Sequence, residues 1–262
     1  MTRMDGLQTW VINLDRAPDR LARISTQLQA LALPFERLAA VDARALKPEQ
    51  MAALDGAAYR RKHGMTPALG ELGCYLSHVE AMRQFLLSEA RFALILEDDV
   101  LLHLSLPAVL RGLLANPGRW DLVKLSAVHS GTPVSVLNLS AGPAPQPHLA
   151  VMLSRCTGSS AYLVNRRAAQ AYLRNPGGLL PMQLPYDHVF DQGWRFDLKV
   201  RLVTPTPCGH DSEIASTIEA TPGGSRKFRW TQRLPTYAYR LRNELQRVAY
   251  GLTQTVREKL GG

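Results

Sequence analysis

Short apolar runs alternate with stretches of helical periodicity as far as residue 203 of the chain. Apolar runs of strand length occur at 9–13, 35–41, 92–96, 120–125, 149–153, 160–164 and 198–203. Apolar residues three or four positions apart predict helices at 18–31, 47–59, 69–90, 107–114, 165–173 and 185–191. A strand, a helix and a second strand at the start form a βαβ unit, which implies a parallel sheet. The pattern predicts an α/β fold with one Rossmann-type domain and a mostly parallel sheet.

The most informative of these runs ends in acids. Phe92–Leu96 is continuously apolar and leads directly into Glu97, Asp98 and Asp99, before apolar residues resume at Val100. A continuous apolar run predicts a strand buried on both faces, and ligands of open α/β sheets bind beyond the carboxyl ends of such strands. Three adjacent carboxylates repel one another unless a cation or a set of donors lies nearby. The run favours a site for a divalent metal ion and a nucleotide diphosphate over a solvated acidic turn.

We assign the metal ion to Asp99, because hard cations such as Mn²⁺ or Mg²⁺ take oxygen ligands. We expect Glu97 and Asp98 to contact the ribose of the nucleotide, or to support the metal ligand without touching the ion themselves. His210, in the segment 204–214 that follows the last strand candidate, is a second candidate metal ligand, although a lone histidine in a loop is often only solvated.

The loop after the first strand lies at the same edge of the predicted sheet. Its arginines have the chemistry to meet a diphosphate, although each is equally well explained as an exposed cation at a helix start. The polar residues assigned to donor binding in this loop are Asn13, Asp15, Arg16 and Arg20.

Three further segments carry candidate chemistry. The small-residue turn 157–160 lets the backbone approach a sugar or phosphate closely at Gly158, although an ordinary hairpin turn has the same composition. The segment 130–148 holds four prolines and is predicted to be a long loop on the acceptor side. In the helix at 69–90, backbone donors near Gly70 can hold an anion, and His78 is expected in the core.

Composition narrows the class of protein. The chain has 262 residues, of which 46% are hydrophobic and 20% charged, as in ordinary globular proteins. Its three cysteines are widely spaced and odd in number, which argues against a disulfide framework and a zinc site and suits a reducing compartment. The start of the chain has no signal-peptide core, and no run has the roughly 18 apolar residues of a membrane span. We therefore expect a cytoplasmic protein.

The positive charge is concentrated at the C-terminus. Residues 223–262 contain nine Lys or Arg against two acids, which gives +7 of the total +9, and residues 1–222 keep 22 basic against 20 acidic residues. The tail alternates arginines with leucines and tyrosines in the pattern of a basic amphipathic helix, a kind that binds anionic membranes. A solvated terminal helix packed on the body would explain the pattern equally well. We divide the chain into a domain at 1–222 and a helical tail at 223–262.

Five segments resemble glycosyltransferase family 25, the lipooligosaccharide and lipopolysaccharide glycosyltransferases related to the procollagen galactosyltransferases. They appear in the family order and span residues 10 to about 214, roughly four-fifths of the chain. The segments are VINLDRAPDR at 11–20, GELGCYLSH at 70–78, LILEDDV at 94–100, TGSSAYLVN at 157–165 and PYDHVFDQGW at 185–194.

The resemblance implies a GT-A-type fold, a UDP-galactose or related UDP-sugar donor, usually Mn²⁺, and inversion at the anomeric carbon. The EDD triplet occupies the place of the fold's Asp-x-Asp motif, which gives Asp99 the metal role. The acceptor would be a saccharide, lipid-linked or part of a surface glycan. The segment 208–214 departs from the family pattern, since Glu213 stands where the family has Asp.

Inverting transfer needs a base that removes the proton of the acceptor hydroxyl. We expect an acceptor-side carboxylate in this role, with Asp187 first, Asp191 second and Glu71 third. Asp187 also sits where a helix N-cap is expected, and capping is a competing explanation for it.

Two other classes compete with a transferase. A metal-dependent phosphatase or nuclease would use the same acids but usually needs more clustered Asp or His ligands. A nucleic-acid-binding protein would account for the basic tail and the pI of about 9.8. Against the second class, the basic residues are confined to one terminus and no nucleic-acid motif is present. We expect no nucleic-acid partner.

Overall fold

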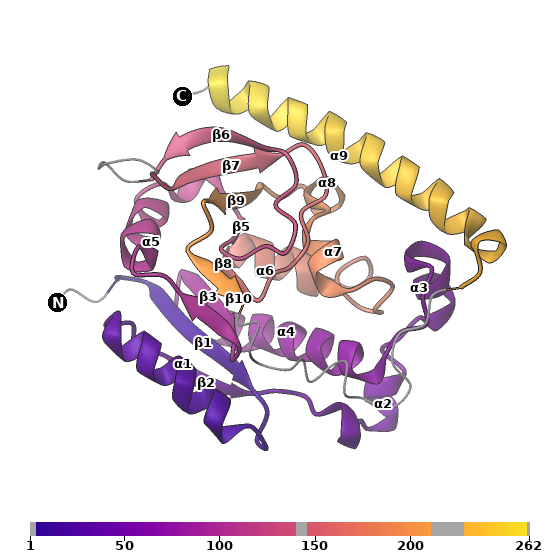
Figure 1. Ribbon diagram of the computed structural model, residues 1–262, viewed down its shortest axis with the longest axis horizontal. Helices are drawn as coiled ribbons and strands as arrows, with labels where there is room; N and C mark the ends of the chain where they lie inside the picture. The colour runs from indigo at the N-terminus through magenta and orange to yellow at the C-terminus, as the bar shows by residue number, and fades with distance from the viewer. Residues whose placement is uncertain (1–3, 140–145, 211–227, 261–262) are drawn as a thin grey trace.

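An eight-stranded sheet forms the centre of the computed structural model, which describes residues 4–139, 146–210 and 228–260 (Figure 1). The strand order is β2-β1-β3-β8-β5-β9-β7-β6, and a second sheet pairs β10 with β4. The strands are β1 (Leu7–Asn13), β2 (Glu36–Ala39), β3 (Phe92–Glu97), β4 (Val100–Leu102), β5 (Leu122–Lys124), β6 (Pro133–Asn138), β7 (His148–Met152), β8 (Ala161–Asn165), β9 (Val200–Thr204) and β10 (Cys208–His210).

Most strands of the large sheet point in one direction, as predicted. β2, β1 and β3 are mutually parallel, and β5 is parallel to β9. β8 pairs antiparallel with both β3 and β5, so the two parallel groups on either side of it share a direction. β7 is also reversed, between β9 and β6. Because β8 is reversed, its beginning lies at the edge where β3 and β5 end.

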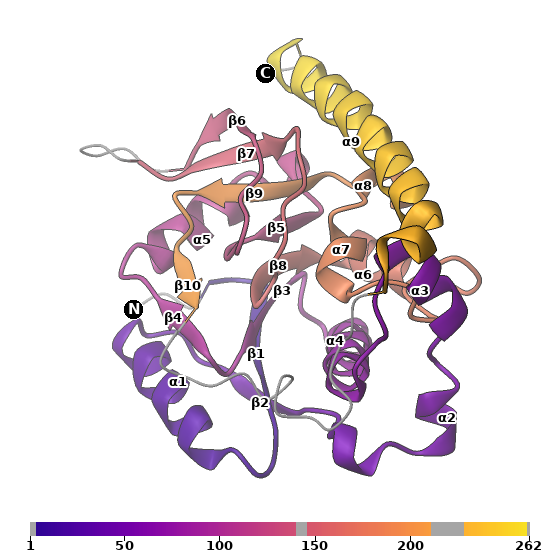
Figure 2. The ribbon, with the colours of Figure 1, turned by 45° about the vertical axis from the view of Figure 1, so that its right-hand side comes forward.

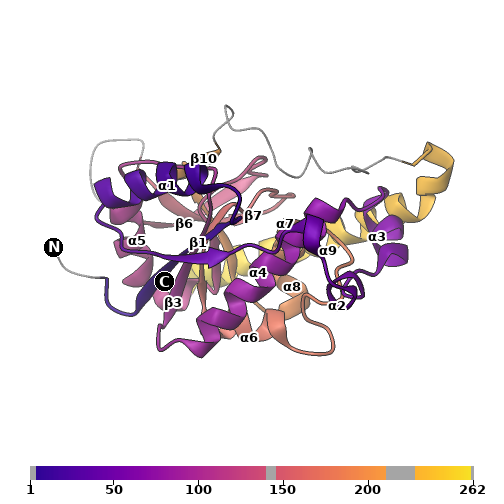
Figure 3. The same ribbon diagram turned by 90° about the horizontal axis from the view of Figure 1, so that it is seen from below.

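Helices cover both faces of the sheet, which confirms the α/β fold (Figure 3). Phe92, Leu94 and Leu96 of β3 pack against α1 and α5, while Ala93 and Ile95 pack with α4 and α6. The apolar run is therefore buried on both faces, as expected. The helices are α1 (Pro18–Ala30), α2 (Pro48–Met51), α3 (Gly56–His63), α4 (Leu69–Leu87), α5 (Leu106–Leu114), α6 (Arg166–Leu173), α7 (Tyr186–Phe190), α8 (Gly193–Phe196) and α9 (Leu234–Leu260), with 3₁₀ turns at Ala43–Ala45, Pro117–Arg119 and Trp230–Arg233.

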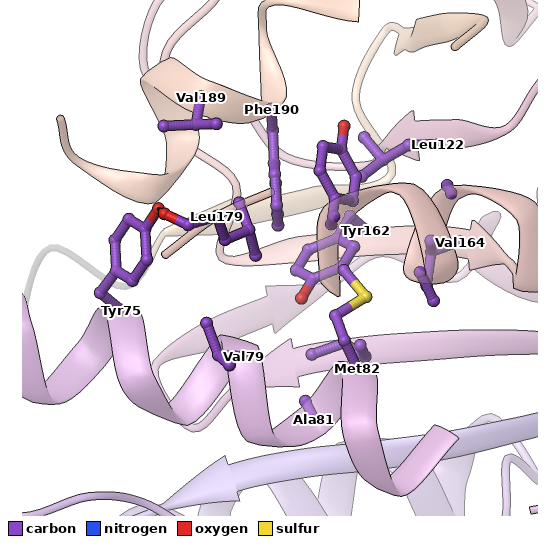
Figure 4. Close-up of a cluster of buried hydrophobic side chains, with 14 of the residues drawn as sticks. Tyr75, Val79, Ala81, Met82, Leu122, Tyr162, Val164, Leu179, Val189 and Phe190 are labelled. Carbon is purple, nitrogen blue, oxygen red and sulfur yellow. Dashed lines mark hydrogen bonds between the residues drawn. The ribbon is translucent and has the colours of Figure 1, made fainter. Parts of the chain in front are cut away.

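Aromatic residues fill the core between α4, α6 and α7 (Figure 4). Tyr162 of β8 packs edge-on against Phe190 of α7, with ring centroids 5.1 Å apart. The Tyr75 hydroxyl of α4 donates to the backbone oxygen of Leu179, 2.5 Å away. These contacts fix α7 against the sheet, and α7 carries the candidate base Asp187.

Two sequence predictions about local structure are wrong. The segment 130–148, predicted as loop, contains β6, whose Pro133 lies at the first position of an edge strand, where a missing N–H is tolerated. Residues 140–145 of that segment lie outside the described residues. The helix expected at 47–59 is two helices, and the second continues to His63 because Gly64, at φ +77°, ends it in the left-handed conformation.

α9 confirms the predicted C-terminal helix and lies along the outside of the molecule, against α3, α8, the edge strand β6 and its neighbour β7 (Figures 1 and 2). Gly251 of α9 touches the backbone oxygen of Met152, where a Cβ would come within 2.9 Å. Within the described ranges, no helix has the length and apolarity needed to cross a bilayer.

Candidate active site

A cavity of about 290 Å³ lies at the edge of the sheet where β3 and β5 end and β8 begins. We call it the sheet-edge cavity. Its carboxylates are Glu71, Glu97 and Asp187, each from a different element. The other lining residues are Cys74, Ser126, Ala127, Val128, Gly158, Ser159, Ser160, Pro185, Tyr186, Cys208, Gly209 and His210. The cavity occupies the position at which open α/β sheets bind ligands.

Glu97, the last residue of β3, is held at the cavity wall by two neighbours. The Tyr186 hydroxyl donates to Glu97 Oε1, and His78 Nε2 lies 3.4 Å from the same oxygen. Burial alone would raise the pKa of Glu97, but the contacts with His78 and Tyr186 hold it below its usual value. Glu97 is therefore an ionised group with a defined orientation.

His78 is fully buried, as the sequence predicted, and it also belongs to this site. Its ring stacks on Tyr186, with centroids 3.9 Å apart, and its Nδ1 lies 3.0 Å from the Tyr162 hydroxyl. Cys74, His78 and Glu97 also bring three possible metal-ligand atoms within 4.8 Å of one another. Burial raises the pKa of the Cys74 thiol well above its usual value, so Cys74 is a poor ligand there. The group is better described as a hydrogen-bonded network.

Asp98 turns away from the cavity toward the loop after β1. Asn13 Nδ2 donates to Asp98 Oδ2 at 2.6 Å, and Arg20 lies 2.5 Å from Asp98 Oδ1. Asn13, Arg20 and Asp98 were all predicted to contact the donor nucleotide. In the structure, Asn13 and Arg20 instead contact Asp98. Both side chains therefore position the turn that carries Asp99.

Asp99 is buried, and its two carboxylate oxygens differ in their contacts. Its Oδ2 lies 2.9 Å from Arg20, whereas its Oδ1 is buried and has no hydrogen-bond partner in the described part of the chain. Burial and then the neighbouring Glu97 raise its pKa to about 6. A buried, unpaired carboxylate oxygen is costly to leave unsatisfied, and an added cation would satisfy it.

His210 reaches Asp99 because β10 pairs with β4. The register sets His210 opposite Val100, and His210 Nδ1 lies 3.9 Å from Asp99 Oδ1. Two ligands of one cation, each about 2.0–2.2 Å from it, can have this separation. The pair predicted from sequence is thus brought together, although Asp211 and Glu213 of the same segment lie outside the described residues.

The remaining predicted donor-loop residues form local ion pairs. Arg16 Nε lies 3.2 Å from Asp42, and Asp15 pairs with Arg37. Neither Arg16 nor Asp15 lines the sheet-edge cavity.

Asp187 also lines the sheet-edge cavity, and its interpretation as an N-cap is wrong. The N-cap position of α7 is Pro185, and Asp187 Oδ2 instead accepts from the Gly158 N–H at 2.8 Å. Gly158 has φ +87° and lies so close to Val128 that only glycine fits without displacement. The turn is not a hairpin, because β7 and β8 are not neighbours in the sheet.

The buried side chain of Lys124 helps to keep Asp187 ionised. Lys124 is fully buried in β5, and its Nζ donates to the backbone oxygens of Cys156 and Asp187 at 2.6 and 3.3 Å. Burial alone would raise the pKa of Asp187, but His188, Lys124 and the Gly158 N–H hold it below its usual value. Sequence reasoning missed Lys124, although a lysine inside a buried strand was the available signal.

Asp191 does not share the cavity with Asp187. It follows the last turn of α7, where Arg247 of α9 lies 2.8 Å from its Oδ2 and the Cys156 N–H donates to the same oxygen at 3.2 Å. The predicted pair of carboxylates is therefore split between two sides of α7. Glu71, the third candidate, lines the sheet-edge cavity and accepts from the Ala68 N–H at the start of α4.

Comparison with known proteins gives one family. The family model described as glycosyltransferase family 25 (LPS biosynthesis protein) matches residues 7–189. Procollagen galactosyltransferase 2 of Homo sapiens is 33% identical over 97 residues, which cover 36% of this chain and 16% of that protein. Procollagen galactosyltransferase 1 of Danio rerio is 26% identical over 175 residues, covering 64% and 28%. A probable inactive glycosyltransferase 25 family member 3 of Bos taurus is 27% identical over 262 residues, covering 88% and 42%. The chain thus spans less than half the length of each.

Proposed function

Because this chain belongs to glycosyltransferase family 25, we propose that it transfers a sugar, galactose or a related hexose, from a UDP-sugar to a saccharide acceptor. The acceptor is part of a lipopolysaccharide, a lipooligosaccharide or another surface glycan. The observation that carries the proposal is the acid pair after β3, where the half-buried Glu97 faces the cavity and the buried Asp99 keeps one oxygen without a hydrogen-bond partner among the described residues.

Asp99 and His210 would hold a divalent cation, Mn²⁺ or Mg²⁺, with further oxygens supplied by the diphosphate of the donor. The unpaired Asp99 Oδ1 and its 3.9 Å separation from His210 fit such an ion. The cation would neutralise charge on the departing diphosphate. Arg20 offsets the negative charge of Asp98 and Asp99 and keeps the turn in place before the ion binds.

Asp187 acts as the base in this proposal. Its carboxylate takes the proton of the acceptor hydroxyl, whose oxygen forms a bond to the anomeric carbon. The bond from that carbon to the diphosphate oxygen breaks, and UDP leaves with the electron pair. Inversion follows because the acceptor attacks opposite the leaving group. Support comes from the position of Asp187 in the lining of the same cavity as Glu97 and from its lowered pKa, which keeps it ionised.

An activity assay tests this proposal directly. Purified full chain is incubated with UDP-galactose and other UDP-sugars, with and without Mn²⁺, and UDP release is measured. We expect cation-dependent UDP release that Asp99→Asn lowers at least about a hundredfold, the scale of losing a group that stabilises transition-state charge. The matched control Asp15→Asn changes an exposed acid outside the cavity and should retain activity. No release from any UDP-sugar, or equal release by both variants, would contradict the proposal.

We also propose that α9 binds an anionic membrane surface through its outer face. α9 turns its polar residues inward: Arg247, Gln254 and Glu258 are buried against the body. Its apolar residues recur three or four positions apart and are exposed. These are Leu234, Tyr237, Leu241, Leu245, Val248, Leu252, Val256 and Leu260. An apolar helix face in water marks an interaction surface.

Charge favours a bilayer over a second copy of the chain as the occupant of this face. Arg242, Arg257 and Lys259 are exposed on α9, while its acids are engaged, Glu244 with Arg247 and Glu258 with Arg119 and Arg201. Two copies joined through α9 would bring cations together, whereas anionic headgroups would pair with them. The free cysteines Cys74, Cys156 and Cys208 agree with a reducing, cytoplasmic compartment.

Co-sedimentation of the full chain with phosphatidylglycerol vesicles tests the membrane proposal. Leu241→Gln with Leu245→Gln should weaken binding at least about tenfold, since each exposed leucine loses part of roughly 1.5–3 kcal/mol of burial. Leu87→Gln with Leu104→Gln removes two leucines exposed elsewhere and should leave binding unchanged. A concentration-dependent dimer that the first double variant abolishes, without vesicle binding, would assign the face to a second copy.

A further inference from the structure

A second cavity, of about 280 Å³, lies between α3, α7 and α9. We call it the α9 cavity. Four basic side chains from three parts of the chain converge on it, namely Lys62, Arg155, Arg240 and Arg247. Two acids line it, Asp191 and Glu244. The lining therefore carries four positive and two negative formal charges, or a net +2.

The two acids share one cation, which offsets one of their two negative charges. Arg247 is buried and contacts both carboxylates, Asp191 at 2.8 Å and Glu244 at 2.7 Å. Within the described residues, Lys62, Arg155 and Arg240 form no ion pair with a carboxylate. Lys62 donates to the side-chain oxygen of Gln183, and Arg240 donates to the backbone oxygen of His63 at 3.0 Å. Among the residues that the structure describes, three cations therefore face one cavity without a carboxylate partner.

Partial burial disfavours the charged forms of two of these cations. Burial lowers the pKa of both Lys62 and Arg240, and the neighbouring Arg233 and Arg155 lower that of Arg240 further. His63 and His188 also line the cavity, with ring centroids 5.2 Å apart. Burial and the nearby cations lower the pKa of His63 to about 4 and lower that of His188, so both rings are neutral at pH 7 and offer N–H donors.

The α9 cavity and the sheet-edge cavity share a wall. α7 contributes Asp187 to the sheet-edge cavity and His188 to the α9 cavity. The segment after β7 does the same with Gly158 and Arg155. A group bound among the cations would thus lie next to His188, which directly follows the carboxylate proposed to act as base.

We propose that the α9 cavity binds an oxyanion, a phosphate or carboxylate group carried by the acceptor saccharide, through Lys62, Arg155 and Arg240. This assignment rests on the proposed transferase function. Arginine pairs with such groups through two parallel hydrogen bonds, which would orient the acceptor as well as hold it. The acceptor hydroxyl then meets Asp187 while the charged group lies on the other side of α7. The protein would prefer an anionic acceptor to its uncharged equivalent.

Binding of small anions to the full chain tests the site. Inorganic phosphate, methyl phosphate and acetate are titrated separately and followed by calorimetry, and UDP-sugar hydrolysis is measured on the same samples. We expect phosphate to bind, and Lys62→Gln with Arg240→Gln to weaken its binding at least tenfold while hydrolysis persists. The control Lys47→Gln with Arg83→Gln makes the same charge change at exposed positions outside both cavities. Arg155→Gln, at an exposed residue, repeats the test where loss of packing cannot explain the result.

The outcomes separate the two proposals. Equal phosphate binding by the native chain and the Lys62/Arg240 variant would overturn the anion site and leave transfer untouched. Phosphate binding lost in that variant, with no UDP-sugar hydrolysis by the native chain, would overturn the transferase and keep the anion site. Methyl phosphate binding as well as inorganic phosphate supports an esterified group on the acceptor. Preference for acetate supports a carboxylate, and binding of inorganic phosphate alone would contradict an acceptor-borne group.

Discussion

Replacing Asp187 by asparagine separates its chemistry from its structural role. The amide oxygen of asparagine can still accept from the Gly158 N–H, which now donates to Asp187 Oδ2 at 2.8 Å. Lys124 donates to the backbone oxygen of Asp187, and that bond is unaffected. We therefore expect Asp187→Asn to change the free energy of unfolding by less than about 1.5 kcal/mol, the scale of one hydrogen bond.

The effect on turnover should be much larger. Asparagine cannot take a proton, and general base catalysis contributes roughly 10²–10⁴-fold, or about 3–5 kcal/mol of barrier. Because the pKa of Asp187 is held below its usual value, the native enzyme should keep an ionised base down to about pH 4. The acid limb of its pH profile at moderate acidity must then come from another group, and Asp99 with a pKa of about 6 is the candidate.

The assay compares UDP release with and without acceptor, together with UDP and Mn²⁺ affinity. Asp187→Asn should lose acceptor-dependent release and keep both affinities within about threefold. Asp191→Asn is the matched comparison, since that carboxylate pairs with Arg247 outside the sheet-edge cavity. It should lower stability rather than turnover. Acceptor-dependent turnover of Asp187→Asn within about threefold of native would refute the assignment and transfer the role to Glu71 or Glu97, the other acids of the cavity.

Four further predictions concern burial, charge, metal binding and backbone. Arg201→Met should cost about 1–3 kcal/mol in urea unfolding, because it removes the nitrogen now 2.8 Å from the buried Glu258, which still pairs with Arg119. Asp99 has a pKa of about 6 in the folded protein, so its contribution to the free energy of unfolding is fully present below about pH 3.9 and is lost as the pH rises through 6. This contribution is at most about 3 kcal/mol. Asp99→Asn should abolish this pH dependence in thermal unfolding. The same pKa predicts roughly tenfold weaker Mn²⁺ binding at pH 5 than at pH 7, measured by electron paramagnetic resonance. Gly158→Ala, whose Cβ would lie 2.7 Å from the Val128 nitrogen, should lower turnover like Asp187→Asn.

The end of β3 could be predicted because its signals are local. The sequence itself contains a continuous apolar run followed by acids. Because ligands bind at the carboxyl edge of such a sheet, this pattern predicts a binding site at the end of β3. The separate directions of Glu97, Asp98 and Asp99 could not be predicted. β3 ends at Glu97, and beyond it each side chain turns toward a partner from another element, Tyr186 for Glu97 and Arg20 for the two aspartates. Those partners are set by tertiary packing.

The amphipathic pattern of the tail predicted a helix but not its orientation. A helical stripe of leucines ordinarily faces the core, and here it faces water. The inward face is polar because the body offers charged partners, Asp191 for Arg247 and the buried Arg201 for Glu258. Such partners lie far away in sequence, so periodicity alone carries no information about them.

The contact between Arg247 and Asp191 connects three parts of the proposed function. Arg247 belongs to the helix whose outer face we assign to a membrane, and Asp191 ends the short helix that presents Asp187 to the sheet-edge cavity. The α9 cavity lies between these two helices, so an acceptor anion bound there would touch both. Because this ion pair is buried, α9 has few ways to shift there without moving Asp191. Docking of α9 on a bilayer would therefore bring the anion site and the proposed base to the surface where a lipid-linked acceptor resides.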